Sequence, residues 1–279
     1  MISRSKNNYI TSLLVFFLIT GLLLLLYPTV SDYWNSHYQS EAVATYSEKL
    51  LDISKEEKQK ILENVSAYNN MLEKGTIPNL NIDSVALKKY DSILNITDTG
   101  IMGYVEIPKL QTTLPIYHGT DDAVLQVAVG HLAGTSLPIG GQGSHAAISG
   151  HRGLPSAKLF SDSDQLVIGD TFMIQVLDNT LTYEIDKIIT VTPDDVSPLM
   201  IDPNEDFVTL VTCTPYGVNS HRLLVRGHRI ENQLLTKQVV SEGSIVKPIL
   251  VSPFIALCLL GLLWSLFFYK KRSKFVYVT

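Results

Sequence analysis

Cys213 stands at the end of an apolar run, where a nucleophilic side chain can be presented at the rim of a sheet. It closes the segment FVTLVTC, and the turn Thr214-Pro215-Tyr216-Gly217 follows it. A thiolate is an intrinsically good nucleophile, so this position suits two-step acyl transfer. An unpaired thiol is also prone to oxidation. A small buried apolar residue is the alternative interpretation of Cys213.

His151 is a second candidate, because it lies in a loop directly after the β-rich run HAAIS. The sequence SGHRG places a glycine on either side of it. Glycine lets the backbone turn sharply and leaves the imidazole accessible, and loops that follow strands often carry catalytic groups. A solvated surface histidine is the alternative. Composition does not decide, since six further histidines exist: His37, His118, His131, His145, His221 and His228.

Arg222 begins the β-rich run that follows the Cys213 turn, nine residues after the cysteine. Two strands joined by so short a loop are expected to be neighbours, with Arg222 and Cys213 at the same end of the sheet. Arg222, Leu224 and Arg226 then share one face of the strand. An arginine cannot act as a base at physiological pH, but it can hold a carbonyl oxygen that becomes negative in a transition state. An ordinary surface ion pair is the alternative.

Few features of the sequence indicate a site for a metal, a phosphate group or a nucleic acid. The sequence has no CxxC pair and no HExxH motif, so we expect neither metal nor cofactor. The acidic pairs Asp121-Asp122 and Asp194-Asp195 are interpreted as solvated turns, and no helix-type pattern follows the glycines at 140–143. Residues 28–246 hold all 27 acidic residues and 15 of the 22 basic ones, a net charge of −12. A nucleic-acid-binding domain would need a basic surface instead.

Two uncharged apolar stretches, 9–27 and 249–269, frame this acidic part. Each is long enough to cross a bilayer, which takes about 20 apolar residues in a helix. Basic residues lie on the outer side of both stretches: Arg4, Lys6, Lys270, Lys271, Arg272 and Lys274. Positive flanks stay in the cytoplasm, so we expect two spans in the cell membrane, cytoplasmic termini and an extracellular middle. A cleaved signal peptide is the alternative for 9–27, although YPTVSDYW lacks a small-residue cleavage pattern.

The segments between the spans change from helical to β-rich. Residues 32–74 are predicted to be helical, with Ser54-Lys55-Glu56-Glu57 as a capping box and Gly75 as a C-terminal cap. From residue 102 the pattern favours short strands and a hairpin turn at Asp178-Asn179. The expected strands are 102–107, 145–149, 171–177, 181–191, 207–213 and 222–230. Many short strands with few long helices predict a closed or sandwiched β-fold.

Taken together, these blocks resemble the sortase family of Gram-positive cell-surface transpeptidases over roughly residues 100–231. TLVTCTPYGVNSHRLLVRGHR (209–229) is similar to the sortase cysteine–arginine block, HAAISGHRGLPSAKLF (145–160) to its histidine block, and MGYVEIPKLQTTLPIYHGT (102–120) to its first strands. The two spans, the long helical region and the sequence of the cysteine–arginine block resemble the pilus-assembling class C.

The resemblance implies an eight-stranded β-barrel in which Cys213 is the nucleophile, His151 the acid and base, and Arg222 the oxyanion and substrate clamp. The implied substrate is a surface protein or pilin with an LPXTG-like sorting signal. It is cleaved between Thr and Gly through a thioester and joined to a lysine amine of a pilin subunit. Three alternatives stay open: a hydrolytic membrane cysteine protease or amidase, a housekeeping-type sortase that attaches proteins to a cell-wall precursor, and a non-enzymatic assembly scaffold.

One departure concerns the lid that class C enzymes usually place over the active site with an Asp-Pro-aromatic motif. Residues 76–100 contain no such tripeptide. Asp83 is the nearest acid, and Tyr90 the nearest aromatic residue. We therefore expect any covering of Cys213 by this segment to be weak and mobile.

The expected organisation follows the chain in seven parts. They are a cytoplasmic N-terminus (1–8), a transmembrane helix (9–27), an extracellular helical region with a possible lid (28–100), the catalytic β-barrel (101–231), a linker (232–248), a second transmembrane helix (249–269) and a basic cytoplasmic tail (270–279).

Overall fold

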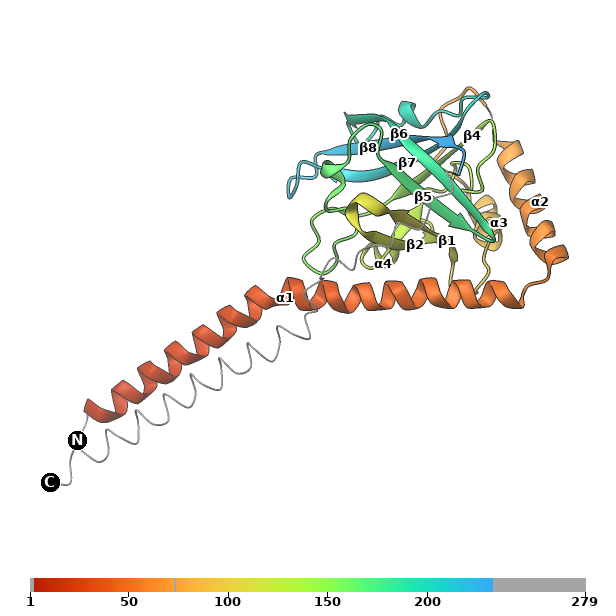
Figure 1. Ribbon diagram of the computed structural model, residues 1–279. Helices are drawn as coiled ribbons and strands as arrows, with labels where there is room; N and C mark the ends of the chain where they lie inside the picture. The colour runs from red at the N-terminus through yellow and green to blue at the C-terminus, as the bar shows by residue number, and fades with distance from the viewer. Residues whose placement is uncertain (1–2, 73, 233–279) are drawn as a thin grey trace. The chain divides into compact units, whose positions relative to one another are not determined.

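The computed structural model describes residues 3–72 and 74–232 and shows eight strands closed into one barrel (Figure 1). The strand order is β1-β2-β3-β4-β7-β8-β6-β5, with β5 pairing back to β1. This confirms the expected eight-stranded barrel with an N-terminal helical region. The strands are β1 Ile101–Ile107, β2 Thr112–His118, β3 Val129–His131, β4 Ser144–Ser149, β5 Thr171–Val176, β6 Asn179–Val191, β7 Asp206–Thr214 and β8 His221–Ile230.

Six of these strands were expected from the sequence pattern, and β2 and β3 were not. β2 contains Pro115, which removes a backbone donor and normally argues against a strand, yet Pro115 pairs with Tyr104 of β1. β3 is three residues long, too short to show any periodicity. The predicted hairpin is present, because Val176 of β5 pairs with Asn179 of β6.

The helical region consists of separate helices rather than one. α1 runs from Ser3 to Asp52 and α2 from Lys55 to Met71. The predicted cap at Ser54 is present, since its hydroxyl accepts a hydrogen bond from the Glu57 backbone N–H at 3.2 Å. Gly75 is not the C-terminal cap, because α2 ends at Met71 with Leu72 as its cap, and Gly75 donates its N–H to the Ile201 carbonyl at 2.8 Å. The remaining helices are short: α3 Ser84–Ser92, α4 Asp122–Leu125 and the 3₁₀ turns Pro108–Leu110, Ser163–Gln165 and Ser197–Leu199.

The barrel strands separate two apolar clusters. Alternate residues of β7 and β8, such as Leu210 and Val225, belong to the large core inside the barrel. A smaller cluster lies on the opposite face of β4, β7 and β8. We call it the outer-face cluster, and it consists of Ala147, Leu199, Val211 and Leu224. Because side chains alternate along a strand, Leu223 and Leu224 of β8 fall in different clusters, as expected for that strand.

The N-terminal helices are tied into the barrel core by two tyrosines. Tyr46 of α1 is fully buried; its hydroxyl donates to the Met102 carbonyl at 3.1 Å and accepts from the Leu177 N–H at 2.9 Å. Tyr90 of α3 is also fully buried, and its hydroxyl lies 2.9 Å from Nδ1 of His131. Burial raises the pKa of both phenols, so both stay neutral donors. Residues 28–100 are therefore an integral part of this fold.

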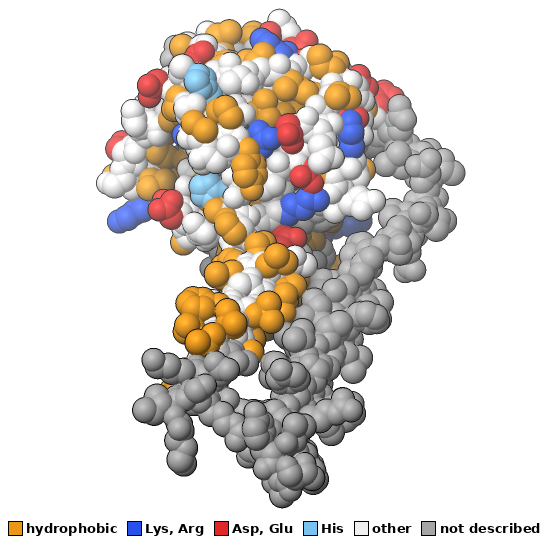
Figure 2. All heavy atoms as spheres, turned by 90° about the vertical axis from the view of Figure 1, so that its left-hand side faces the viewer, with side chains coloured by type: hydrophobic (Ala, Val, Ile, Leu, Met, Phe, Trp, Pro, Cys, Tyr) orange, Lys and Arg blue, Asp and Glu red, His pale blue; other side chains and the backbone are white. Residues whose placement is uncertain are grey.

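The first half of α1 exposes a dense run of large apolar side chains. Large side chains are more than half exposed at Tyr9, Leu14, Phe17 and Leu25. Figure 2 shows this gathering of hydrophobic side chains, which contrasts with the mixed surface of the barrel. By length and composition, the helix over residues 12–52 can cross a membrane. The second expected span, 249–269, lies outside the described residues.

Candidate active site

The parallel pairing of β4 with β7 brings His151 beside Cys213. The register runs from Ser144 opposite Asp206 to Ser149 opposite Val211. It continues past the end of β4, where the Gly150 N–H donates to the Val211 carbonyl at 3.0 Å and the Thr212 hydroxyl to the Gly150 carbonyl at 2.7 Å. One residue further, the same register sets His151 level with Cys213. Parallel strands end at the same edge of a sheet, which is why two residues 62 positions apart meet here.

The antiparallel hairpin of β7 and β8 supplies the third residue. Cys213 and Arg222 are direct cross-strand partners, so their side chains lie on the same face of the sheet. Nη1 of Arg222 donates to the carbonyls of Asn219 and His221, both at 3.2 Å. The Cys213 thiol is free and partly exposed. All three residues that the sequence singled out therefore meet at one edge of the barrel.

The site opens on the outer face of the barrel. Val211, two residues before Cys213, and Leu224, two residues after Arg222, both belong to the outer-face cluster. Cys213 and Arg222 share their face by strand alternation. The reactive edge is thus continuous with apolar side chains, while Thr212 faces the other way and is buried.

The glycines around His151 have two different physical roles. A Cβ at Gly150 would lie 2.7 Å from the Phe160 ring and 2.9 Å from Val129, so this position is a close packing contact. Gly153 has a φ of +80°, and a Cβ there would lie 2.7 Å from the Tyr216 ring. Only Gly153 provides the sharp turn expected from the sequence. The His151 ring is partly exposed and has no hydrogen-bond partner among the described residues.

Arg152 is a residue that the sequence analysis passed over. Its side chain is only 9% exposed and forms an ion pair of 2.7 Å with Asp164. Nε donates to the Ser161 carbonyl and Nη1 to the Thr214 hydroxyl, each at 3.3 Å. Arg152 directly follows His151 and Thr214 directly follows Cys213. Their hydrogen bond therefore connects the two chain segments that carry these candidate catalytic residues. Nothing in its type or spacing distinguishes it in the sequence, since an arginine in a polar loop is normally solvated.

Two other histidines are structural. His131 is fully buried, with Nε2 2.8 Å from the Ser136 carbonyl. His145 is 1% exposed, with Nδ1 2.9 Å from the Met200 carbonyl and Nε2 2.7 Å from the Thr209 hydroxyl. Burial lowers the pKa of each imidazole to about 4, because a charged ring loses its hydration there.

Asp83 and Tyr90, which belong to the segment with the possible lid, form their hydrogen bonds away from the candidate active site. The Asp83 carboxylate caps α3 and accepts from the N–H groups of Val85 and Ala86, both at 2.8 Å. Tyr90 lies in the core, as described above. Within the described part of the chain, no hydrogen bond or ion pair joins residues 77–100 to Cys213, His151 or Arg222.

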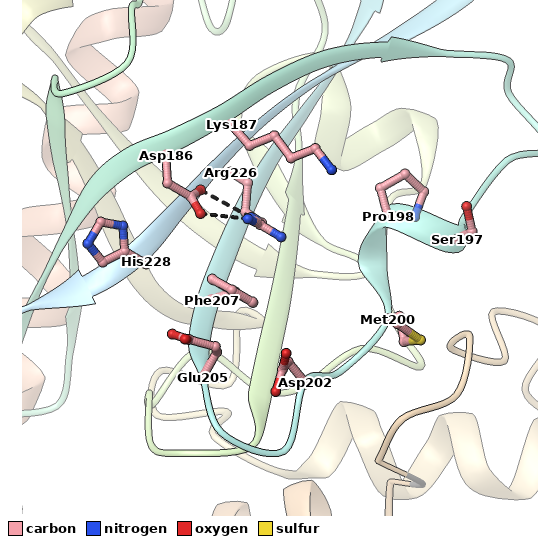
Figure 3. A pocket seen from close by; sticks show the side chains of 10 residues that line it. All are labelled: Asp186, Lys187, Ser197, Pro198, Met200, Asp202, Glu205, Phe207, Arg226 and His228. Carbon is pink, nitrogen blue, oxygen red and sulfur yellow. Dashed lines mark hydrogen bonds and ion pairs between the residues drawn. The ribbon is translucent and has the colours of Figure 1, made fainter.

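A cavity of about 460 Å³ lies further along the same strands, among residues of β6, β7, β8 and the loop before β7 (Figure 3). Arg226 crosses it, with two hydrogen bonds to Asp186 of 3.1 and 2.6 Å and its guanidinium 4.1 Å from the centre of the Phe207 ring. Phe207 precedes Cys213 by six residues, about 20 Å at the rise of an extended strand. Cys213, His151 and Arg222 are not among the residues that line this cavity.

The barrel is also the part of the chain that is similar to a known protein family. Residues 105–230 match the family described as Sortase domain. The fold is similar to sortase C1 of Streptococcus agalactiae, with 47% identity, a TM-score of 0.67, and coverage of 69% of this chain and 100% of that one. Sortase C of Streptococcus pneumoniae gives 40% identity, a TM-score of 0.60, and coverage of 68% and 96%.

A curated relative is more distant. Sortase D of Bacillus subtilis is 31% identical over 131 residues, which span 46% of this chain and 63% of that protein. The barrel, the order of the blocks and these likenesses lead to one conclusion: the chain belongs to the sortase family of cysteine transpeptidases, in its class C.

Proposed function

We propose that this chain is a membrane-anchored transpeptidase that cleaves an LPXTG-like sorting signal between Thr and Gly. The acyl group is then joined to a lysine amine of a pilin subunit. The observation that carries the proposal is the meeting of three residues at one edge: Cys213 paired with Arg222, and His151 level with Cys213 through the β4–β7 register.

Each residue has a distinct role in the proposed first step. The sulfur of Cys213 attacks the Thr carbonyl, and a carbon–sulfur bond forms as the carbonyl oxygen becomes negative. His151 accepts the thiol proton as the sulfur attacks, and donates it to the leaving Gly amine as the carbon–nitrogen bond breaks. A thioester on Cys213 remains. The partial exposure of both side chains supports this step, because a reacting peptide must reach them from solvent.

Arg222 is proposed to hold the developing oxyanion. A guanidinium has five N–H donors, and both hydrogen bonds of Arg222 to the hairpin come from Nη1. The Nε and Nη2 groups have no partner within the described part of the chain. A preorganised donor aimed at developing charge is among the strongest catalytic contributions.

The second step transfers the acyl group to an amine. The lysine reacts as its neutral amine: as the nitrogen attacks the thioester, His151 takes a proton from it, the carbon–sulfur bond breaks, and His151 returns that proton to the sulfur of Cys213. The preference for an amine over water, and for a pilin as partner, is supported by likeness to class C enzymes. One of these, sortase C of Streptococcus pneumoniae, has pilin substrate specificity.

The proposed location is the cell membrane, with the barrel outside and both termini in the cytoplasm. The exposed apolar surface of α1 supports the first span, since such a surface is unfavourable in water. The charge flanks support the orientation. The second span stays a prediction from residues 249–269.

The test uses the full-length protein in detergent micelles, with an LPXTG-like peptide and with or without a lysine-bearing peptide. We expect a joined product by mass spectrometry when the lysine peptide is present, and no cleavage by Cys213→Ala. The second cysteine of the chain, Cys258, lies in the apolar stretch 249–269; Cys258→Ala is therefore the matched thiol control and is expected to keep activity. Hydrolysis without any joined product would identify a protease instead, and cleavage by Cys213→Ala at the wild-type rate would disprove the nucleophile.

A further inference from the structure

One face of α1 is directed at the barrel from Asp32 to Tyr46. Asp32, Asn35, Gln39 and Tyr46 are spaced by three, four and seven residues, which places them on the same side of a helix. Tyr46 is anchored in the core by its two hydrogen bonds. Because α1 is continuous over this stretch, the burial of Tyr46 fixes where the side chains of Asp32 and Asn35 point.

These two side chains bind the backbone of the loop that carries His151. We call residues 150–162 the His151 loop. The Lys158 N–H donates to the Asp32 carboxylate at 2.6 Å, and the Asn35 amide donates to the Ser156 carbonyl at 2.7 Å. The neighbouring Gln39 binds elsewhere, to the Val127 carbonyl at 2.7 Å. A loop without ladder hydrogen bonds depends on such contacts for its backbone conformation.

The contacted part of the loop leads directly back to His151. Phe160 is fully buried, packs where Gly150 leaves room, and donates its N–H to the His151 carbonyl at 3.2 Å. Leu159 between the contacts is buried and has a φ of +38°, an unfavourable conformation for leucine that surrounding contacts must maintain. The loop is therefore closed at one end by Phe160 and held at its far side by α1.

We propose that Asp32 and Asn35 are positioning residues for His151: the anchor helix holds the His151 loop in the conformation that aligns the imidazole with Cys213. The inference rests on the proposed role of His151 in acyl transfer. It assigns to α1, at a point five residues beyond the apolar stretch that ends at Tyr27, a function other than attachment to the membrane.

The experiment compares variants of the full-length protein in detergent micelles. Asp32→Ala with Asn35→Ala removes both contacts, and Asp32→Asn keeps an acceptor oxygen. Ser36→Ala is the matched control on the same helix, because among the described residues the Ser36 hydroxyl bonds only the Tyr33 carbonyl of α1. For the double variant we expect amide hydrogen exchange in residues 152–160 to accelerate about tenfold, and kcat for acyl transfer to fall about tenfold, as for the loss of two ordinary hydrogen bonds. KM should stay within about twofold, since both substitutions lie on α1 and leave the side chains around Cys213 and Arg222 unchanged.

Rescue separates positioning from general damage. Asp32→Asn and Ser36→Ala are expected to keep wild-type exchange and kcat, and the thermal midpoint of all variants should stay close to that of the wild type. Unchanged amide hydrogen exchange in the double variant would show that Asp32 and Asn35 do not hold the His151 loop. Faster exchange with unchanged kcat, or a raised KM alone, would overturn the positioning role. If the wild type itself transfers no acyl group, the proposed function fails, and so does the role of α1 in it, whatever the exchange shows.

Discussion

The two buried histidines of the barrel strands and the histidine of the β4–β5 loop occupy opposite environments. His131 and His145 are buried, and both of their ring nitrogens have hydrogen-bond partners. His151 is partly exposed, and its ring has no partner among the described residues. An imidazole that is fully hydrogen-bonded and kept neutral by burial has no free nitrogen for a reacting molecule. An imidazole without such partners has two free nitrogens.

The chemical role of a histidine therefore follows from its hydrogen bonds more than from its place in a motif. His145 and His151 lie six residues apart in one block. His145 points to Thr209 and the Met200 carbonyl and holds the loop before β7 against the sheet. His151, one residue beyond the last ladder contact, is free to act on a substrate.

The largest expected effect comes from exchanging each of these two histidines for glutamine. His151→Gln should lower kcat by about a hundredfold or more, which is the usual contribution of a general acid and base, with little change in the thermal midpoint. His145→Gln should lower the thermal midpoint but keep kcat per folded molecule within about threefold. Peptide cleavage and thermal unfolding of both variants check this. A severe loss of kcat in folded His145→Gln would contradict the purely structural role of His145.

The next effect concerns Arg222. Arg222→Lys keeps the positive charge but loses the planar fork. We expect kcat to fall at least about tenfold, by comparison with the loss of one oxyanion donor. The matched control is Arg226→Lys on the same face of β8, whose guanidinium is bound to Asp186. An unchanged kcat in Arg222→Lys would reduce this arginine to a structural role.

The buried histidines also predict how stability depends on pH. Each has a pKa of about 4 in the folded chain, against 6.5 in the unfolded chain. The unfolded state therefore binds more protons between these values, and stability is lost as the pH falls from about 6.5 towards 4. The loss reaches about 3 kcal/mol for each group at 1.36 kcal/mol per pKa unit.

Chemical unfolding at pH 7, 5.5 and 4.5 tests this dependence. The measurement compares the wild type with His145→Gln, so that the carboxylates contribute equally to both proteins. We expect a shallower pH dependence in the variant. Parallel curves would show that the His145 imidazole binds protons equally in the folded and unfolded chains, which would contradict the lowered pKa of the buried ring.

The smallest expected effect is at the segment with the possible lid. Asp83→Ala removes the cap of α3 and should cost about 1 kcal/mol of stability. Labelling of Cys213 by a small thiol reagent should stay within about twofold of the wild type, because Asp83 binds Val85 and Ala86 and not the site. Labelling faster by about a hundredfold would show that residues 76–100 do cover the cysteine.

Local patterns in the sequence were sufficient for most of the elements and for the three candidate residues. The cap at Ser54, the hairpin at Asp178-Asn179 and the faces of β8 follow from short-range chemistry, and the structure agrees with them. β2 and β3 could not be predicted, because a strand with an internal proline and a strand of three residues exist only through their neighbours in the barrel.

The residues that can do chemistry could be recognised from local features: a thiol at the end of a strand, a glycine-flanked histidine and a nearby arginine. Their assembly at one edge depends on the tertiary structure, since His151 is brought level with Cys213 by a parallel pairing of strands 62 residues apart. The same holds for Arg152, whose contacts with Asp164 and Thr214 have no local signal. It holds also for Asp32 and Asn35, whose bonds to the His151 loop cross more than 120 residues of chain. Contacts at that separation depend on how the whole barrel closes, which no short stretch of sequence specifies.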